Sequence, residues 1–361
     1  MPANHPALLR ARSFCEAHSL RVPILMAPMA GACPVSLAIA VANAGGLGAC
    51  GVLLMQPEAI GAWVAEVRAA TNGGFQLNTW IPDPPPMRDA ANETAVRRFL
   101  DSWGPGVAAE AGDTAPVDFQ AQCEAMLDAG PAIISSIMGV YPPAMVARMK
   151  AKGIRWFANV TTVAEARAAV AAGCDVVVAQ GMEAGGHRGV FDAAKAEAGM
   201  IGLFALLPTV VDAVGTVVPV VATGGIADAR GIAAALLLGA SAVQIGTGLL
   251  RTPEAKIAPV WADAIGRADP EDTTVTRAFT GRLGRSVATD YVQAANGPLA
   301  PRPAPYPVQR ALTQAMRDAG NKAADIDRMQ AWAGQSAKLA STEPATGLVL
   351  RLWDEAQALL G

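Results

Sequence analysis

The sequence predicts an α/β protein built on a (β/α)8 TIM barrel, with an additional mainly helical domain on the substrate side. The first observation is a series of eight short apolar runs within the first 250 residues. The second is that segments of helical composition separate most of these runs, the alternation expected of a mainly parallel sheet. The third is composition, because 361 residues with 52% hydrophobic and 16% charged side chains can bury a large core and exclude extensive disorder.

Each apolar run has the length of a buried strand. Strands of a parallel sheet are covered on both faces, so they form unbroken apolar stretches. Several helical segments between them end at glycine, and eight strand–helix units are the number that closes a barrel. The predicted strands are PILMA (23–27), GLGAC (46–50), FQLNT (75–79), AIISS (132–136), IRWFA (154–158), DVVVA (175–179), PVVAT (219–223) and AVQIG (242–246).

Two other architectures fit the sequence less well. An open, doubly wound sheet would favour a GxGxxG motif directly after the first strand, and residues 23–51 contain none. Residues 201–223 and 231–250 are each long and apolar enough to cross a bilayer, but Pro208, Asp212 and Gly239 interrupt them. We therefore interpret each as a buried helix followed by a buried strand.

The barrel is expected to occupy residues 1–250, with one interruption. Residues 81–116 are rich in Pro, Gly and charge, which is typical of a lid or a mobile segment. Residues 251–361 lose the strand pattern and contain helical stretches, so we expect a helical elaboration packed on the barrel. An arm that forms a homodimer is the alternative for this tail.

Charge and cysteine content limit the classes of binding partner and indicate the cellular compartment. The 28 basic and 31 acidic residues give a net charge of −3, which predicts no nucleic-acid or membrane partner and favours a small molecule. Five scattered cysteines without a CxxC pair indicate reduced thiols, and the first twenty residues lack a signal-peptide pattern. A cytoplasmic protein is expected.

Catalytic groups of a TIM barrel lie at the carboxyl ends of its strands. The residues there include neither an acid pair nor His, Cys, Asp or Glu at metal-ligand spacing, so we expect no metal and an organic cofactor instead. Exposed N–H groups of Gly224, Gly225, Gly246 and Thr247, after the last two strands, could cradle a phosphate. The alternative is that these glycines only relieve tight turns.

One histidine and two carboxamides are predicted at the same end of the barrel. His187 is the only histidine of three in a strand-end loop, which makes it the candidate catalytic group. Asn78 and Gln180 can donate and accept, which suits the edge of a flavin or the tying of loops. Met29 offers either a soft face to a flat ring or core packing. We expect Glu183 and Arg188 to form an ion pair or to be solvated.

Several motifs together resemble those of class I nitronate monooxygenases, formerly called 2-nitropropane dioxygenases. The similarity runs across nearly the whole chain, and EAGGHRG is its most specific part. The motifs are APMAG (27–31), AGGLGACG (44–51), AQGMEAGGHRG (179–189), ATGGI (222–226), QIGT (244–247), FTGR (279–282) and WAGQSA (332–337).

The resemblance implies a barrel enzyme that binds FMN and oxidises alkyl nitronates, notably propionate 3-nitronate, with dioxygen to an aldehyde and nitrite or nitrate. It implies that His187 is the active-site histidine, orienting or stabilising the nitronate. Carried over residue by residue, the flavin lies among Met29, Asn78, Gln180 and Gly185, and its phosphate lies at Gly225 and Gln244, Ile245, Gly246 and Thr247.

Two other functions remain open from the sequence. A flavin-dependent enoyl-acyl-carrier-protein reductase or NAD(P)H:quinone reductase shares the barrel and similar Gly-His loops. A non-catalytic barrel that only binds flavin or phosphate would retain the ligand without turnover.

Overall fold

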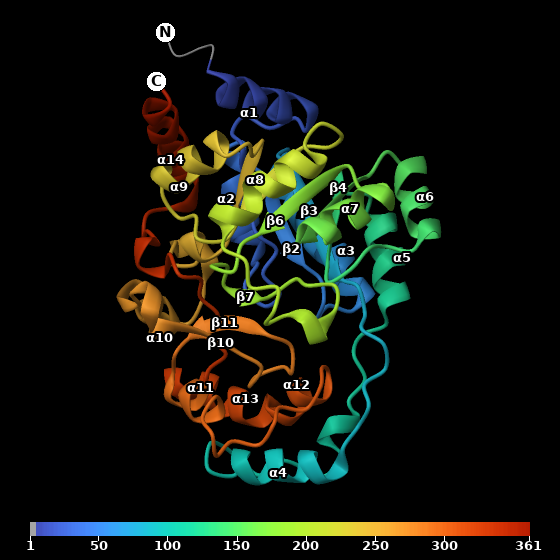
Figure 1. Cartoon of the computed structure of the whole chain (residues 1–361), viewed down its shortest axis with the longest axis vertical. Helices are drawn as coiled ribbons and strands as arrows, with labels where there is room; N and C mark the ends of the chain where they lie inside the picture. Colours follow the sequence, from blue (N-terminus) through green and yellow to red (C-terminus); the bar gives the residue numbers. More distant parts are fainter. Residues whose placement is uncertain (1–4) are drawn as a thin grey trace.

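The eight predicted strands form one parallel sheet that curls into a barrel in the computed structural model, which describes residues 5–361 (Figure 1). The sheet order is β1-β9-β8-β6-β5-β4-β3-β2, and a parallel bridge between Leu25 and Leu47 joins its two edges. The predicted (β/α)8 barrel is therefore confirmed. Its strands are β1 (Ile24–Met26), β2 (Gly48–Gly51), β3 (Phe75–Trp80), β4 (Ile133–Ile137), β5 (Arg155–Val160), β6 (Val176–Gln180), β8 (Val220–Thr223) and β9 (Ala242–Ile245).

Helices cover the outside of the barrel, and all but the last follow the strand order. The final helix, α14, packs against α2 and α9, so the barrel takes one helix from the 251–361 segment. Residues 201–223 and 231–250 fold as helix–strand pairs, as predicted. The covering helices are α2 (Val35–Asn43), α3 (Pro57–Ala70), α5 (Phe119–Ala129), α6 (Pro143–Ala151), α7 (Val163–Ala171), α8 (Leu203–Val214), α9 (Ala229–Leu237) and α14 (Ala345–Leu359).

A further helix, α1 (Pro6–Ala17), plugs the amino-terminal end of the barrel. Its Phe14 and Cys15 pack with side chains inside the barrel, among them Leu25 and Phe157. His18 follows this helix, with its ring 4.5 Å from that of Phe14 and 5.1 Å from that of Phe157 between centroids. The plug thus places a titratable group in an apolar setting.

We expect His18 to make the fold less stable in acid. Burial and the charge of Arg155 lower the pKa of His18 to about 4, whereas in the unfolded chain the pKa is about 6.5. The unfolded state therefore binds more protons between these values, so stability from the neutral ring is complete above pH 6.5 and is lost towards pH 4. The Tm advantage of the wild-type protein over His18→Gln should shrink by about 1–3 °C from pH 7 to pH 4.5 in calorimetry. A constant difference would contradict this role.

A second lobe lies beyond the carboxyl ends of the strands, at the bottom of Figure 1. Its core joins two distant parts of the chain, because Val96 and Leu100 pack with Phe279, Tyr291 and Leu312. Residues 81–116 therefore supply a helix to this lobe. The helices of the lobe are α4 (Ala90–Leu100), α10 (Pro259–Arg267), α11 (Asp290–Ala295), α12 (Val308–Leu312) and α13 (Gln314–Ala323).

A small antiparallel sheet connects the two lobes, and the sequence analysis did not predict it. Its strands are β10 (Thr273–Thr276), β11 (Gly284–Val287) and β7 (Gly186–His187). The segments TTVT and GRSV are short and polar, so they lack the apolar pattern that indicates a strand. The pairing of Gly284 with His187 holds the glycine-rich loop after β6 against the second lobe.

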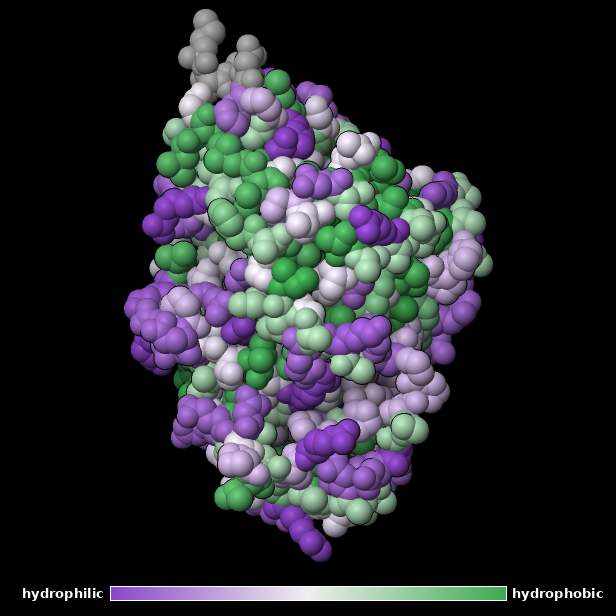
Figure 2. All heavy atoms as spheres, in the orientation of Figure 1, coloured by the Kyte–Doolittle hydropathy of each residue, from purple (hydrophilic) through white to green (hydrophobic). Residues whose placement is uncertain are grey.

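Hydrophobic side chains are more frequent over the barrel half than over the second lobe in the view of Figure 2. No helix formed by residues 5–361 combines the length and the apolar composition needed to cross a membrane.

Candidate active site

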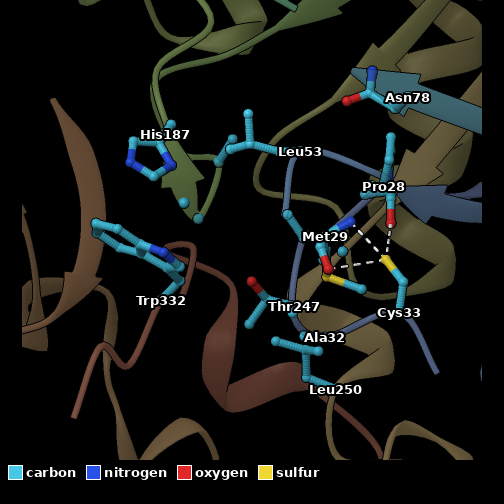
Figure 3. A pocket seen from close by; sticks show the side chains of 18 of the residues that line it. Pro28, Met29, Ala32, Cys33, Leu53, Asn78, His187, Thr247, Leu250 and Trp332 are labelled. Carbon is cyan, nitrogen blue, oxygen red and sulfur yellow. Dashed lines mark hydrogen bonds between the residues drawn. The ribbon is translucent and has the colours of Figure 1, made fainter. Parts of the chain in front are cut away.

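The predicted residues meet at a cavity of about 770 Å³ between the strand ends and the second lobe. Ile245 is the exception, because its side chain is buried in the barrel wall beside the cavity. Figure 3 shows Met29 and Asn78 on one wall and His187 and Trp332 across from them. The predicted residues that line the cavity are Met29, Asn78, Gln180, Gly185, His187, Gly224, Gly225, Gln244, Gly246 and Thr247.

Two glycine turns at one side of the cavity carry unused N–H groups. Gly224 and Gly225 follow β8 with φ angles of +108° and +70°, which favour glycine. Gly246 and Thr247 follow β9 and lead into a short 3-10 helix, Thr247–Leu249. Within residues 5–361, no acceptor is found for the main-chain N–H groups of these four residues. Four free donors at two adjacent strand ends form a cradle suited to a phosphate.

The two predicted carboxamides have different partners. The side chain of Gln180 is tied to the loop that follows it, donating to His187 O at 3.1 Å and accepting from Gly189 N at 2.8 Å. Asn78 Nδ2 donates to Ser135 Oγ at 3.0 Å, and its oxygen faces the cavity in Figure 3. Gln180 therefore positions the loop, whereas Asn78 keeps an acceptor available for a ligand.

The loop after β1 presents a side chain rather than its main chain at Met29. The N–H group of Met29 is occupied, because it donates to Cys33 Sγ at 2.7 Å (Figure 3). Burial raises the pKa of Cys33 to about 11, so the thiol stays protonated. Met29 thus offers its thioether to the cavity, and Cys33 fixes the turn.

His187 lies between two indole rings at the edge of the cavity. Its ring centroid is 4.6 Å from that of Trp80 and 4.9 Å from that of Trp332, both edge to face. Its Nε2 is 2.8 Å from Thr280 Oγ1, in the FTGR motif. No protein group within the described chain hydrogen-bonds to Nδ1, and the ring faces Met29 and Asn78 in Figure 3. One nitrogen is therefore fixed and the other is free for a ligand.

The surroundings of His187 keep its imidazole neutral. Burial, followed by the charges of Arg282 and Arg310, lowers the pKa of His187 to about 3. A neutral imidazole has one N–H donor and one acceptor nitrogen. At neutral pH this ring can donate a single hydrogen bond into the cavity, but it does not contribute a positive charge.

The expectation for Glu183 and Arg188 is wrong. Arg188 is buried and donates to the main-chain oxygens of Gln180, Thr161 and Gly199. Glu183 instead accepts from Leu203 N at 2.8 Å, at the start of α8. Main-chain carbonyl groups satisfy the charge of Arg188, and the N-terminus of α8 satisfies the charge of Glu183. The sequence around these two residues does not indicate either contact.

An ion pair ties the Pro-rich segment to the mouth of the cavity. Arg282 is 2% exposed in its side chain, and its Nε donates to Asp83 Oδ2 at 2.8 Å. Its other guanidinium nitrogens contact Asp83 Oδ1 and Val190 O. Residues 81–116 and the FTGR motif are thereby joined beside Thr280, the partner of His187.

The sequence analysis missed several residues of the cavity wall. Trp80 and Asn159 lie at strand ends, so the rule used for Asn78 could have found them. Asn159 Nδ2 is buried without a hydrogen-bond partner, which indicates room for a ligand acceptor. Arg310 and Arg317 come from the tail, where no sequence pattern marks them as lining a cavity, whereas Trp332 opens the WAGQSA motif without having been assigned a role.

The lining is consistent with an anionic organic ligand. Among the described residues it includes Lys256, Arg310 and Arg317 but no Asp or Glu. Residues 5–361 contain no group of three or more His, Cys, Asp or Glu placed to hold a metal ion. A TIM barrel with free main-chain N–H groups at two strand ends and a neutral imidazole at its mouth is typical of barrel enzymes that use an organic cofactor.

Sequence comparison identifies the family within that class. A family model described as nitronate monooxygenase matches residues 12–355. A nitronate monooxygenase from Paraburkholderia phytofirmans is 39% identical over 336 residues, 91% of each chain. A probable nitronate monooxygenase from Staphylococcus aureus is 31% identical over 348 residues, 95% of this chain and 96% of the relative. The chain belongs to the nitronate monooxygenase family, and the predicted resemblance and enzyme class are confirmed.

Two solved structures share the fold over nearly the whole chain. A nitroalkane oxidase from Streptomyces ansochromogenes superposes with a TM-score of 0.84 and 34% identity, over 95% of this chain and 98% of that chain. FabK from Thermotoga maritima superposes with a TM-score of 0.74 and 26% identity, over 96% of each chain.

Proposed function

We propose that this enzyme oxidises alkyl nitronates of the propionate 3-nitronate type with dioxygen, using FMN, to an aldehyde and nitrite or nitrate. One observation carries the proposal: the cavity holds four free main-chain N–H groups and a neutral imidazole, and none of the residues 5–361 that line it is an Asp or Glu. Membership of the nitronate monooxygenase family supports the substrate class.

The cavity residues fit FMN in number and chemistry. We assign the phosphate to the N–H groups of Gly224, Gly225, Gly246 and Thr247. The polar edge of the ring system would meet Asn78 and Gln244, together with the unpaired Nδ2 of Asn159. The Met29 side chain supplies an apolar contact. When bound, FMN supplies the electron transfer between nitronate and dioxygen.

His187 binds the nitronate in this proposal. We assign the donor role in the 2.8 Å contact between Thr280 Oγ1 and His187 Nε2 to the hydroxyl. With that assignment the ring proton lies on Nδ1, and Nδ1–H donates to a nitronate oxygen. Trp80 and Trp332 exclude water around this hydrogen bond, which strengthens it. Gln180 contributes by fixing the loop that carries Gly185 and His187.

Oxygen uptake compared with NADH oxidation tests the function. The purified yellow protein should consume dioxygen when propionate 3-nitronate is added, and in anaerobic buffer NADH should leave its flavin oxidised. Rapid bleaching by NADH, without nitronate-dependent uptake, would indicate a reductase. A yellow protein inert to both would indicate a binding protein, and a colourless one that takes up no flavin would end the FMN assignment.

A further inference from the structure

The loop that carries His187 is rich in glycine and is not tightly packed from behind. Four of the eleven residues 179–189 are glycine, and Gly186 has a φ angle of +73°. Glycine has more conformational freedom to lose than any other residue. A void of about 10 Å³, with room for about one water molecule, is lined by this loop and by residues of β10 and β11. Packing alone therefore does not fix the position of His187.

The residue directly after the active-site histidine, Arg188, holds the loop on two sides. Its main-chain N–H donates to Leu283 O at 2.8 Å, next to β11 of the small sheet. Its guanidinium group points to the barrel and donates to three main-chain oxygen atoms, those of Gln180, of Thr161 at 3.3 Å and of Gly199 at 2.8 Å. These acceptors belong to the end of β6, to the residue directly after β5 and to the segment before α8. One side chain thus joins the loop to two strand ends.

The cation of Arg188 is buried without a carboxylate in direct contact. Arg188 is 5% exposed and belongs to no ion pair among residues 5–361. Burial lowers its pKa to about 10, and the charges of Glu165 and Glu183 oppose this shift from a distance. Glu165 also accepts from Phe191 N at 2.8 Å, so it holds the chain just beyond the loop. Because a buried charge is costly, we look for its role in the geometry that it fixes.

We propose that Arg188 is a positioning residue for the oxidation of nitronates. Its guanidinium group fixes the loop to the ends of β5 and β6, so that the His187 ring stays between Trp80 and Trp332 with Nδ1 free. Arg188 does not line the cavity, so it acts through His187 and not on the substrate. This inference rests on the proposed function and adds the residue that keeps its imidazole in place.

Turnover is the first measurement. Arg188→Met keeps an unbranched side chain but removes the charge and all three donors. Because a misplacement of about 1 Å can lower a rate by about 10²-fold, kcat/KM for propionate 3-nitronate should fall by about 10- to 100-fold in oxygen uptake. Flavin content should stay at the wild-type value, since the phosphate cradle lies at other strand ends. Arg188→Lys keeps the charge but not the planar fork of donors, so it should recover part of the loss.

The ring of His187 can also be observed directly, without turnover. In the wild-type protein its pKa is lowered to about 3, so it should not titrate between pH 5 and 8. A released loop would expose the ring to water and return this pKa towards about 6.5. Proton–carbon NMR spectra of protein labelled at histidine Cε1 should therefore show His187 titrating in Arg188→Met. The signal is assigned by its absence from His187→Asn.

The groups around the ring do not confuse this titration. They are Arg310, Tyr306, and Arg282 with its partner Asp83. None of these side-chain types changes its charge between pH 5 and 8 in the ordinary range of its pKa, and burial raises the pKa of Tyr306 further.

Arg10→Met is the matched control. Arg10 lies on α1 at the opposite end of the barrel, and it too donates to main-chain oxygens, those of Leu236 and Ala240, without an ion pair among residues 5–361. The variant loses a similar set of hydrogen bonds. It should keep the wild-type kcat/KM and a His187 that does not titrate above pH 5.

Three results would overturn the role of Arg188. The first is wild-type turnover in Arg188→Met, and the second is a loss of turnover while His187 still does not titrate above pH 5. The third is an Arg188→Lys protein that equals the wild type in both measurements, because the fork of donors would then be unnecessary; this variant also decides the matter if Arg188→Met does not fold. If the wild-type protein consumes no nitronate, the proposed function fails, and the titration still tests whether Arg188 places the ring.

Discussion

Replacing His187 by asparagine is expected to lower kcat/KM for propionate 3-nitronate by about 10² or more, the usual scale for a positioned group that stabilises charge. The imidazole is held between Trp80 and Trp332 with Nδ1 free, so the shorter side chain cannot place a donor at the same point. Steady-state oxygen uptake measures the effect. Unchanged turnover would remove His187 from the mechanism.

Two comparisons separate chemistry from folding in this experiment. The His187→Asn protein should keep its flavin content, because the phosphate cradle lies at other strand ends. Thr280→Val keeps the ring but removes its 2.8 Å contact at Nε2, so we expect a smaller loss, about tenfold. If Thr280→Val had no effect, the hydroxyl would not set the position of the ring proton.

The low pKa of His187 adds a pH criterion. Because this pKa is lowered to about 3, the free enzyme carries a neutral ring throughout pH 5 to 8. The pH profile of kcat/KM for a preformed nitronate should therefore contain no ionisation of His187 near pH 6.5. The wild-type and His187→Asn profiles should have the same shape in this range. Such an ionisation would mean that the imidazole is charged in the working enzyme.

Replacing Gly225 by valine is expected to abolish most of the bound cofactor. A β-branched residue at a φ of +70° costs about 1–3 kcal/mol, which favours a changed turn. The change removes N–H donors from the cradle, and each hydrogen bond to a charged group contributes about 1.5–3 kcal/mol. Flavin affinity should fall by about tenfold or more, measured as flavin per protein and as the Kd on reconstitution.

Gly153→Val provides a matched control for this prediction. Gly153 has the same φ of +70° and no atom within 4 Å of the position of an added Cβ, and it lies in the turn between α6 and β5. It carries the same backbone strain but not the contact that an added Cβ at Gly225 makes with Glu183 Cβ at 3.2 Å, so it should lose less stability and keep its flavin. A fully loaded Gly225→Val protein would contradict the phosphate assignment.

The sequence predicted the strands because burial on both faces leaves a local mark, an unbroken apolar run. Contacts between distant residues left no such mark. Thr280 lies within a recognised motif, but its bond to His187 spans 93 positions. Arg310 and Arg317 lie on tail helices, and helical periodicity does not show which faces border a cavity. The same limit explains why β10 and β11 were missed and why the place of α14 became visible only in the structure.

The place of α14 has a consequence for synthesis. Because α14 follows the other described elements in the chain, a nascent chain exposes the apolar faces of α2 and α9 until this helix has left the ribosome. When α14 packs against these faces, its side chains Leu348, Val349 and Leu352 become buried and cover them. A stop codon shortly before residue 345 would leave every strand and every cavity residue intact, yet produce a chain whose barrel remains open to chaperones and proteases.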